Sequence, residues 1–342
     1  MNSCQMPIDP SQCVTLAHGG GGRLTDRLVR EIFAPAFGLD RALLNDGAEP
    51  GNEGWVITTD AHVVHPLIFP GGDIGCLAAH GTCNDLAMAG AAPAWLAVSW
   101  ILEEGVSIEL VRRVAESLAA GARMSGAKVV AGDTKVVERG KGDGIFLQAC
   151  GFGKRMCAEA PGPWRLAPGQ VLVVSGDMAR HGAAIMSARG GGLGFAGDIT
   201  SDCGPLWPLV RALFEAGIEP VAMRDCTRGG LATVLAEWAE GSSVGLVVQE
   251  AEIPVLEAVR GACEVLGLDP LYVACEGRFV AAVEAGQAEA SVAVLRGIAG
   301  GEDARVIGEV SGVYAGRAVA LQAYGTERVL DRLAGEALPR IC

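Results

Sequence analysis

The chain has 342 residues, of which 50% are hydrophobic and 20% charged, and this is enough apolar material for the cores of two ordinary domains. Its formal net charge of -13 at pH 7 argues against nucleic acid and anionic membrane surfaces as partners. The 11 cysteines lack Cys-x2-Cys spacing and the first residues lack a signal-peptide pattern. We therefore expect a cytoplasmic protein with reduced thiols, without structural zinc and without a membrane span.

The first half of the chain alternates between helical and strand-like hydrophobic patterns. After a loose lead-in at 1–17 and four glycines, the predicted helices cover 23–33, 74–89 and a Ser107-capped stretch to 124, and the predicted strands cover 55–59, 95–102, 128–131 and 144–152. The uncharged stretch 86–102 is short for a bilayer and interrupted by Gly and Pro, so we expect a buried helix, a turn at 90–93 and a buried strand.

A segment rich in proline and glycine at 157–169 marks the best domain boundary. Beyond it the predicted strands cover 171–175, 244–249 and 279–283, and the predicted helices cover 179–188, 205–216, 229–240, 254–266 and 287–298. This mixture of strands and helices is typical of α/β or α+β domains. We expect a glycine-rich segment with a helix at 1–40, an N-terminal domain at 41–158, a C-terminal domain at 165–325 and a flexible tail at 326–342.

Five aspartates flank apolar runs beside small residues: Asp46, Asp60, Asp85, Asp133 and Asp225. Carboxylates at strand ends and helix starts can converge on one edge of a sheet, and Mg²⁺ usually binds one or two carboxylates together with substrate phosphates. A single such aspartate is more often a helix N-cap or a turn residue. Five in this setting favour a site for Mg²⁺ and a nucleotide, which also explains how so acidic a chain could bind phosphates.

The glycine run, Gly19, Gly20, Gly21 and Gly22, precedes a predicted helix. Its backbone can approach an anion closely and the helix start adds N–H donors, although a flexible linker is an equally good interpretation. Among the histidines, we expect His62, His65 and His80 to be structural. His18 and His181 flank glycines and are weaker candidates for contact with a ligand.

Three charged residues are further candidates for the chemistry. Lys135, beside Asp133, could neutralise a transferring phosphate or a developing oxyanion, or it could form a surface ion pair of little energetic value. Arg228, before two glycines, could do either. Glu276, between an apolar run and a strand, could be a general base or a turn carboxylate.

The chain ends in Cys342, at the tip of a segment that could enter a site on the same chain or on another protein. A frayed end is the plain alternative, because termini are usually poorly ordered. A prenylation signal is excluded, since it requires the cysteine fourth from the end.

Together these motifs resemble the HypE family of hydrogenase maturation factors. The matching segments run nearly end to end: LAHGGGGR at 16–23, FPGGDIG at 69–75, NDLAM at 84–88, GDTKVV at 132–137, TRGGL at 227–231 and LPRIC at 338–342. The resemblance implies an α+β, two-domain fold like that of aminoimidazole ribonucleotide synthetase (PurM). In that fold, strands of the N-terminal domain form a dimeric barrel, and ATP with Mg²⁺ binds near the interface of a homodimer.

The resemblance also implies a reaction that contributes to [NiFe] hydrogenase maturation. A partner, HypF, places a carbamoyl group on Cys342, and ATP phosphorylates the carboxamide oxygen so that phosphate can leave. A base removes the nitrogen protons, and elimination leaves a thiocyanate. The cyanide then passes to iron on a HypC–HypD complex.

By the same resemblance, each requirement has candidate residues here. Magnesium would be held by Asp46, Asp85 and Asp225. The nucleotide would be held by the glycine run, Asp60, Asn84, Asp133, Thr134, Thr227 and Arg228. Lys135 and Glu276 would serve charge stabilisation and proton transfer.

Two other functions fit the same residues. One is a related ATP-dependent kinase or synthetase acting on a free small molecule, which would not need Cys342. The other is a non-catalytic carrier, in which the terminal thiol is loaded and delivered while the nucleotide only switches the conformation.

Overall fold

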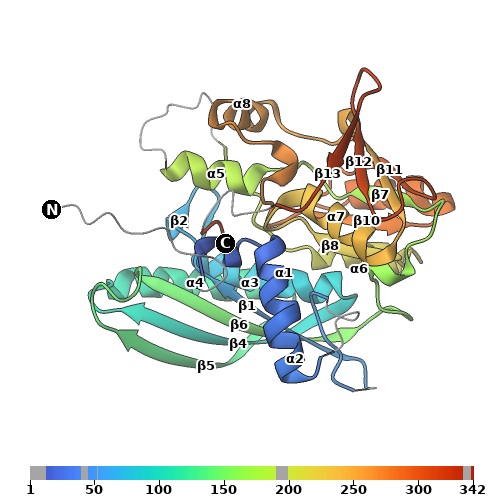
Figure 1. Ribbon diagram of the computed structural model, residues 1–342. Helices are drawn as coiled ribbons and strands as arrows, with labels where there is room; N and C mark the ends of the chain where they lie inside the picture. The colour runs from blue at the N-terminus through green and yellow to red at the C-terminus, as the bar shows by residue number, and fades with distance from the viewer. Residues whose placement is uncertain (1–12, 40–44, 52, 190–198, 334–339) are drawn as a thin grey trace.

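The computed structural model describes residues 13–39, 45–51, 53–189, 199–333 and 340–342. Residues 1–12 of the predicted lead-in, and Leu338 and Pro339 of the terminal motif, lie outside the described residues. Within the described ranges no helix is both long enough and apolar enough to cross a membrane. Strands and helices form two sheet-based halves that pack against each other, so the α+β expectation is confirmed (Figure 1).

The N-terminal half contains a four-stranded sheet in the order β1-β6-β4-β5. Its elements are α1 (Arg23–Leu28), the π-helical turn η2 (Val29–Phe33), α2 (Ala34–Phe37), β1 (Trp55–His62), β2 (Ile68–Phe69), β3 (Gly72–Asp73), α3 (Ile74–Met88), β4 (Ala91–Glu103), α4 (Ile108–Met124), β5 (Lys128–Val137) and β6 (Ile145–Arg155). Strands β4 and β5 run parallel, whereas the β1–β6 and β4–β6 pairs are antiparallel. Helices α3 and α4 cover the face of this sheet that looks toward the C-terminal half (Figure 1).

Both covering helices begin where the sequence predicts. The Asp73 carboxylate accepts hydrogen bonds from the N–H groups of Gly75 at 2.8 Å and Cys76 at 3.1 Å, and so caps α3. The Ser107 hydroxyl accepts from Leu110 N–H at 3.1 Å and caps α4. The capped start of α3 directs the helix across the sheet, which brings Asp85 in its last turns to the end of the helix nearest β8 of the other half.

The C-terminal half contains a seven-stranded sheet in the order β13-β12-β9-β11-β7-β10-β8. Its elements are η4 (Pro163–Arg165), β7 (Val171–Val174), α5 (Arg180–Arg189), α6 (Trp207–Glu215), β8 (Ala222–Asp225), α7 (Gly230–Ser242), β9 (Gly245–Gln249), η5 (Glu250–Glu252), α8 (Glu257–Leu266), η6 (Pro270–Tyr272), β10 (Phe279–Val283), η7 (Ala285–Gln287), α9 (Ala288–Arg296), β11 (Arg305–Ser311), β12 (Ala318–Leu321) and β13 (Glu327–Leu330). Every residue of β10 is buried, as expected for a strand with neighbours on both sides and helices on both faces.

Several boundaries differ from the sequence prediction. Strand β1 continues past Asp60, β4 begins before Pro93 rather than after a turn, and β5 continues through Gly132–Lys135 instead of ending there. The sequence pattern does not reveal that β5 continues through its polar end, because β5 is an exposed edge strand and needs no alternation of apolar residues. Strands β8, β11, β12 and β13 were missed; β13 pairs with β12, so the predicted tail at 326 begins later.

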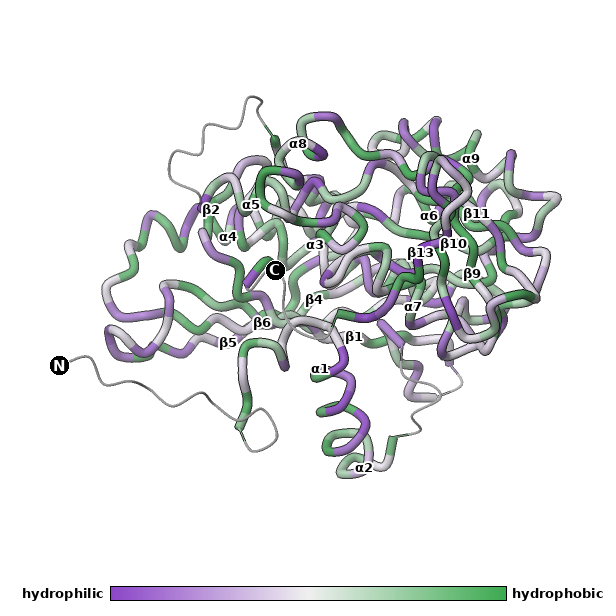
Figure 2. The backbone as a smooth tube through the Cα atoms, turned by 45° about the horizontal axis from the view of Figure 1, so that its top comes forward, coloured by the Kyte–Doolittle hydropathy of each residue, from purple (hydrophilic) through white to green (hydrophobic). Residues whose placement is uncertain are grey.

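The end of the chain is docked in the middle of the molecule, between the two halves, in both views (Figure 1, Figure 2). Val63 N–H donates to Cys342 O at 3.1 Å and His65 N–H donates to Arg340 O at 3.2 Å, so the last residues pair with the chain that follows β1. Ile341 is only 3% exposed and belongs to the main hydrophobic core. The expectation of a freely swinging end is therefore wrong for this conformation.

We expect Gly75→Ala to lower the free energy of unfolding by about 3 kcal/mol, the upper part of the range for overpacking a core. A Cβ at Gly75 would lie 2.2 Å from the Val114 carbonyl oxygen, where α3 and α4 pack together. The matched control is Gly241→Ala in α7, where a Cβ meets nothing within 4 Å and should add about 0.5–1 kcal/mol. Denaturant unfolding checks both, and equal stability of the two variants would contradict the packing described here.

Candidate active site

A cavity of about 410 Å³ lies between the two halves of the molecule. Both halves and the end of the chain contribute to its lining: Val29, Asn45, Asp46, Thr59, Asp60, Gly81, Asp85, Arg224, Asp225, Thr227, Arg228, Glu276 and Cys342. Half of the candidate residues from the sequence therefore meet at one place. Among these lining residues, five carboxylates face two guanidinium groups, so the cavity is acidic.

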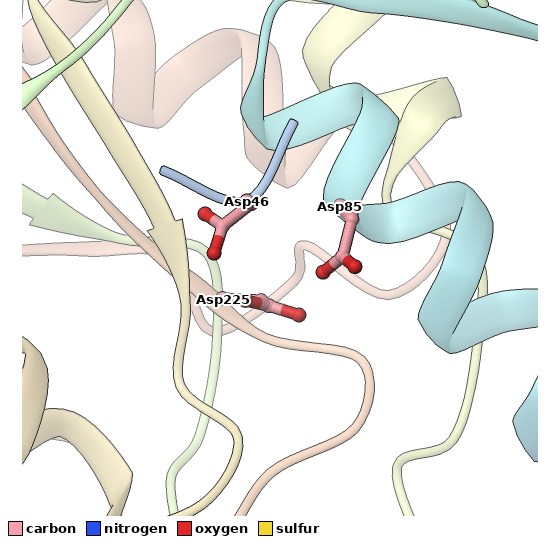
Figure 3. Close-up of side chains that lie close together, drawn as sticks. All are labelled: Asp46, Asp85 and Asp225. Carbon is pink, nitrogen blue, oxygen red and sulfur yellow. The ribbon is translucent and has the colours of Figure 1, made fainter. Parts of the chain in front are cut away.

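Three aspartates form the floor of this cavity and point toward one another (Figure 3). Asp46 lies in the loop before β1, Asp85 on α3 and Asp225 at the end of β8. One carboxylate oxygen from each lies within 4.8 Å of the others. The prediction that these aspartates converge is confirmed, although they come from a loop, a helix and a strand rather than from one sheet edge.

Burial and mutual repulsion raise the pKa of all three carboxyls. Burial is the larger cause each time; the charge of Asp225 adds to it at Asp85, and the charge of Asp46 adds to it at Asp225. The pKa of Asp225 is raised to about 7. At Asp46 the rise is opposed by Arg224, whose Nε lies 2.8 Å from Asp46 Oδ1. The three groups are close enough to repel and are only partly neutralised by protein cations.

The chemistry of this aspartate trio fits a hard divalent cation. Asp46 Oδ2 is buried and has no hydrogen-bond partner, although a buried carboxylate oxygen normally has one. Asp85 Oδ2 has the Thr58 hydroxyl at 2.9 Å, and that hydroxyl also lies 2.7 Å from Asp46 O, which fixes the two segments relative to each other. An all-oxygen set with free lone pairs facing a cavity is what Mg²⁺ binds together with phosphates.

The glycine run packs against Arg228, one of the residues that line the cavity. Arg228 Nη1 donates to the Gly19 carbonyl at 3.1 Å, and a Cβ at Gly21, whose φ is +74°, would lie 3.1 Å from Arg228 Cβ. A Cβ at Gly22 would lie 2.5 Å from Leu333 O. Gly21 and Gly22 are thus closely packed and favour glycine at these two positions, whereas a Cβ at Gly19 would meet nothing within 4 Å.

Glu276 is buried beside the aspartates, with only 4% of its surface exposed, and its Oε1 has no hydrogen-bond partner. Burial, followed by the charges of Asp225 and Asp60, raises its pKa well above the usual range. Its backbone is held by Asp202, whose Oδ2 accepts from Glu276 N–H at 3.3 Å and Gly277 N–H at 3.2 Å. A carboxyl with a raised pKa and an unengaged oxygen can accept a proton from a bound group.

The Cys342 thiol lines the same cavity as the aspartate trio and Glu276 of its own chain. Burial raises the pKa of this thiol, the charges of Glu276 and Asp60 raise it further, and only Arg228 lowers it. The docked sulfur is therefore protonated and a poor nucleophile.

Three predicted site residues are not brought to the cavity within one chain. Asp133, Thr134 and Lys135 lie on β5, at the opposite edge of the sheet from β1, which contributes Thr59 and Asp60 to the lining. Three strand spacings, about 14 Å, separate the two edges. The Lys135 side chain is 72% exposed and forms an ion pair with Asp133 at 2.7 Å.

Asn84 also differs from the prediction. It is 1% exposed, and its amide joins the two halves: Nδ2 donates to Gly204 O at 3.1 Å and to Glu276 O at 3.3 Å, while Oδ1 accepts from Leu206 N–H at 2.8 Å. In this structure the side chain positions the Glu276 segment and does not line the cavity.

Sequence reasoning gave no role to Thr58, Arg224 or Asp202. Thr58 and Arg224 stand next to motif residues, so their proximity was a signal, but nothing in the sequence pairs Asp202 with Glu276. His181, a weak candidate for ligand contact, instead lies 2.7 Å from Ile341 O with its Nε2. Cys275 Sγ accepts from Ala179 N–H at 3.1 Å and packs in the core of the C-terminal half.

The chain is similar to known proteins in both sequence and fold. Models for AIR synthase related proteins match the chain twice, the N-terminal domain over residues 38–154 and the C-terminal domain over residues 167–319. Carbamoyl dehydratase HypE of Cupriavidus necator is 47% identical over 347 residues, covering 99% of this chain and 97% of that protein. The crystal structure of a HypE–HypF complex matches with a TM-score of 0.84 and 40% identity, covering 90% of this chain and 99% of the other. HypE in complex with ATP matches with a TM-score of 0.82 and 42% identity, covering 96% and 100%.

We expect Asp85→Asn to reveal two effects of the aspartate trio separately: the charge repulsion that lowers stability without a cation, and the cation binding that raises it. In chelator the variant should be more stable than the parent by about 1.4 kcal/mol, the equivalent of one pKa unit of repulsion. Mg²⁺ at 100 times its Kd should stabilise the parent by about 2.7 kcal/mol and the variant much less. The control is Asp133→Asn, which removes an exposed carboxylate outside the trio. Thermal unfolding with and without Mg²⁺ is the measurement, and the same Mg²⁺ response in all three proteins would exclude this site.

Proposed function

The chain belongs to the HypE family of carbamoyl dehydratases, and from that premise we propose that it uses ATP to dehydrate a carbamoyl group carried on its own Cys342, as a step in hydrogenase maturation. The observation that carries the proposal is the position of Cys342, which lines one cavity with the aspartate trio, Arg228 and Glu276 of the same chain. A kinase acting on a free molecule would have no use for a thiol docked there.

The cavity contains groups suited to each step. Bound between the trio and the glycine loop, ATP would be held by Mg²⁺ on Asp46, Asp85 and Asp225, and that ion supplies charge neutralisation at the phosphates. Thr227, Asp60 and Arg228 line the same space and would contact the nucleotide. The γ-phosphoryl group passes to the carbamoyl oxygen of S-carbamoyl Cys342, and ADP leaves.

The second step breaks the carbon–oxygen bond. The carbamoyl nitrogen gives up both of its protons: Glu276, with its raised pKa and free Oε1, accepts the first, releases it to water, and accepts the second as phosphate departs. The nitrogen forms its further bonds to carbon as phosphate departs with the oxygen. The sum is S-carbamoyl Cys342 plus ATP giving S-cyano Cys342, ADP and phosphate, so the protein loses the mass of one water.

Loading must take place outside the cavity. While docked, the thiol is protonated, because burial raises its pKa. We therefore propose that the tail leaves the cavity to receive the carbamoyl group from HypF and, after dehydration, leaves again to deliver cyanide to a HypC–HypD complex. Each departure would expose Arg340, Ile341 and Cys342 together.

We also propose that the chain acts as a homodimer in which β5 supplies Lys135 to the cavity of the partner subunit. Strand β5 is an exposed edge, and Val129, Val130 and Val136 on it are 43%, 61% and 67% exposed. An exposed apolar edge of this length favours pairing with another chain. Pairing there would bury the edge and remove Lys135 from solvent.

Cys342→Ala should still bind ATP but accept no carbamoyl group and support no hydrogenase maturation, whereas Cys13→Ala, which removes an exposed thiol elsewhere, should behave like the parent. Given Mg²⁺ and ATP, the carbamoylated parent should lose about 18 Da, the mass of one water, by intact mass spectrometry. Full maturation with Cys342→Ala would refute the proposal. An unchanged mass, with ATP bound, would favour the non-catalytic carrier.

Mixed dimers test the source of the lysine. Lys135→Ala and Cys342→Ala should each be inactive alone, but mixing the subunits should restore dehydration in one site per heterodimer, because one chain supplies the thiol and cavity and the other supplies Lys135. The matched control mixes Glu276→Ala with Cys342→Ala, which should not complement, since Glu276 and Cys342 share one chain's cavity. Single-turnover ADP release is the readout. No rescue in the first mixture would contradict supply of Lys135 by the partner subunit, and activity of Lys135→Ala alone would place Lys135 outside the reaction.

A further inference from the structure

The docked tail is held by more than its pairing with the chain after β1. His181 on α5 is fully buried, and its Nε2 lies 2.7 Å from the carbonyl oxygen of Ile341, the residue before the terminal cysteine. Its Nδ1 lies 2.8 Å from the hydroxyl of Ser201. The edge of the Phe69 ring packs against the imidazole, with the ring centroids 5.4 Å apart and the planes at 89°. The imidazole is therefore fixed in position and orientation.

These contacts determine which nitrogen carries the proton. A carbonyl oxygen can only accept, so Nε2 must be the donor to Ile341. In a neutral imidazole Nδ1 then accepts from the Ser201 hydroxyl. Burial lowers the pKa of His181, in agreement with the neutral form. Both nitrogens are thus engaged, and neither is free to exchange protons with a substrate.

Arg189, about two turns after His181 at the end of α5, also contacts the tail. Its Nε donates to His65 O at 2.6 Å, and its Nη2 donates to Arg340 O. Its guanidinium therefore connects the tail to the segment on which the tail pairs. Together, Arg189 and His181 contact two successive carbonyl groups of the tail, those of Arg340 and Ile341. Because both contacts are to the backbone, they set how far Cys342 reaches into the cavity without depending on the side chains of the tail.

We infer that His181, supported by Ser201 and assisted by Arg189, is a positioning residue that docks the terminal tail so that Cys342 reaches the cavity. The inference deepens the proposed function and rests on it for the meaning of docking. His181 does not line the cavity and touches no reacting atom, so it acts only through the Ile341 carbonyl.

The same contacts connect docking to the base. Ser201 is followed by Asp202, which holds the Glu276 backbone, and the Ser201 hydroxyl also accepts from Cys203 N–H at 2.9 Å. Gly204 O in the same loop accepts from Asn84. The loop at 201–204 therefore contacts the docking histidine and the segment that carries Glu276, so a docked tail also stabilises the position of the general base.

The first test measures docking alone. Alkylation of Cys342 by iodoacetamide, followed by mass spectrometry of the C-terminal peptide, reports how often the tail leaves. His181→Ala should be alkylated about five times faster than the parent, the ratio expected from losing one ordinary hydrogen bond. His181→Gln, which keeps a donor at a similar reach, should restore most of the protection. Equal rates in the parent and His181→Ala would overturn the inference.

The matched control is His80→Ala. His80 is also a buried histidine, and its Nδ1 lies 3.1 Å from the Ser125 hydroxyl, but it does not touch the tail. It should lose stability without faster alkylation of Cys342, so a change in both variants would indicate general loosening. If His181→Ala does not fold, Arg189→Met, at a half-buried position, tests the same docking through the Arg340 carbonyl.

The second test measures the consequence. In single turnovers of carbamoylated protein at saturating ATP, His181→Ala should slow dehydration severalfold, because a docked tail without the Ile341 contact no longer holds the reacting group in position. The ATP concentration for half-maximal rate should stay unchanged, because the nucleotide site is intact. Faster alkylation without slower dehydration would limit His181 to tail protection and overturn its positioning role. The alkylation result does not depend on the proposed reaction, so failure of carbamoylation itself would count against the proposed function and not against docking.

Discussion

The arrangement of the molecule depends on three carboxylates that would repel one another if all were charged and no cation lay near them. Asp46, Asp85 and Asp225 come from a loop, a helix and a strand of different halves, so their approach requires both halves to pack as they do. Arg224 neutralises only one of them. The remaining negative charge is the physical reason that a divalent cation would be drawn to this cavity, and such a cation would in turn bind phosphates.

The terminal tail meets a second, opposing requirement. It must dock tightly enough for Cys342 to reach the aspartate trio, and it must leave readily enough for the thiol to react elsewhere. The contacts match this balance: one buried side chain, Ile341, and a few hydrogen bonds to carbonyls, set against the conformational freedom that the tail loses on docking. The raised pKa of the docked thiol also keeps docking and reaction with partners apart, because the sulfur becomes reactive only in the undocked state.

The sequence predicted the structure best where a residue interacts only with its near neighbours along the chain. The caps at Asp73 and Ser107 are local signals, and the structure bears them out. The convergence of the aspartates could be suspected from their settings, and the family resemblance then gave their grouping. What could not be foreseen were contacts across long stretches of chain, such as Asp202 with Glu276 and His181 with Ile341, because no local pattern records a partner 74 or 160 residues away.

Lys135 shows how an expectation drawn from a sequence motif can go unmet within one subunit. Its motif suggested a cation at the phosphates, yet the strand order places it on the far edge of the sheet, exposed and paired with Asp133. An edge strand with exposed valines is unfavourable in isolation, and the role proposed for Lys135 needs its side chain at an acidic cavity. Pairing of two chains through β5 would meet both requirements at once. Assembly of the dimer and catalysis would then depend on the same strand.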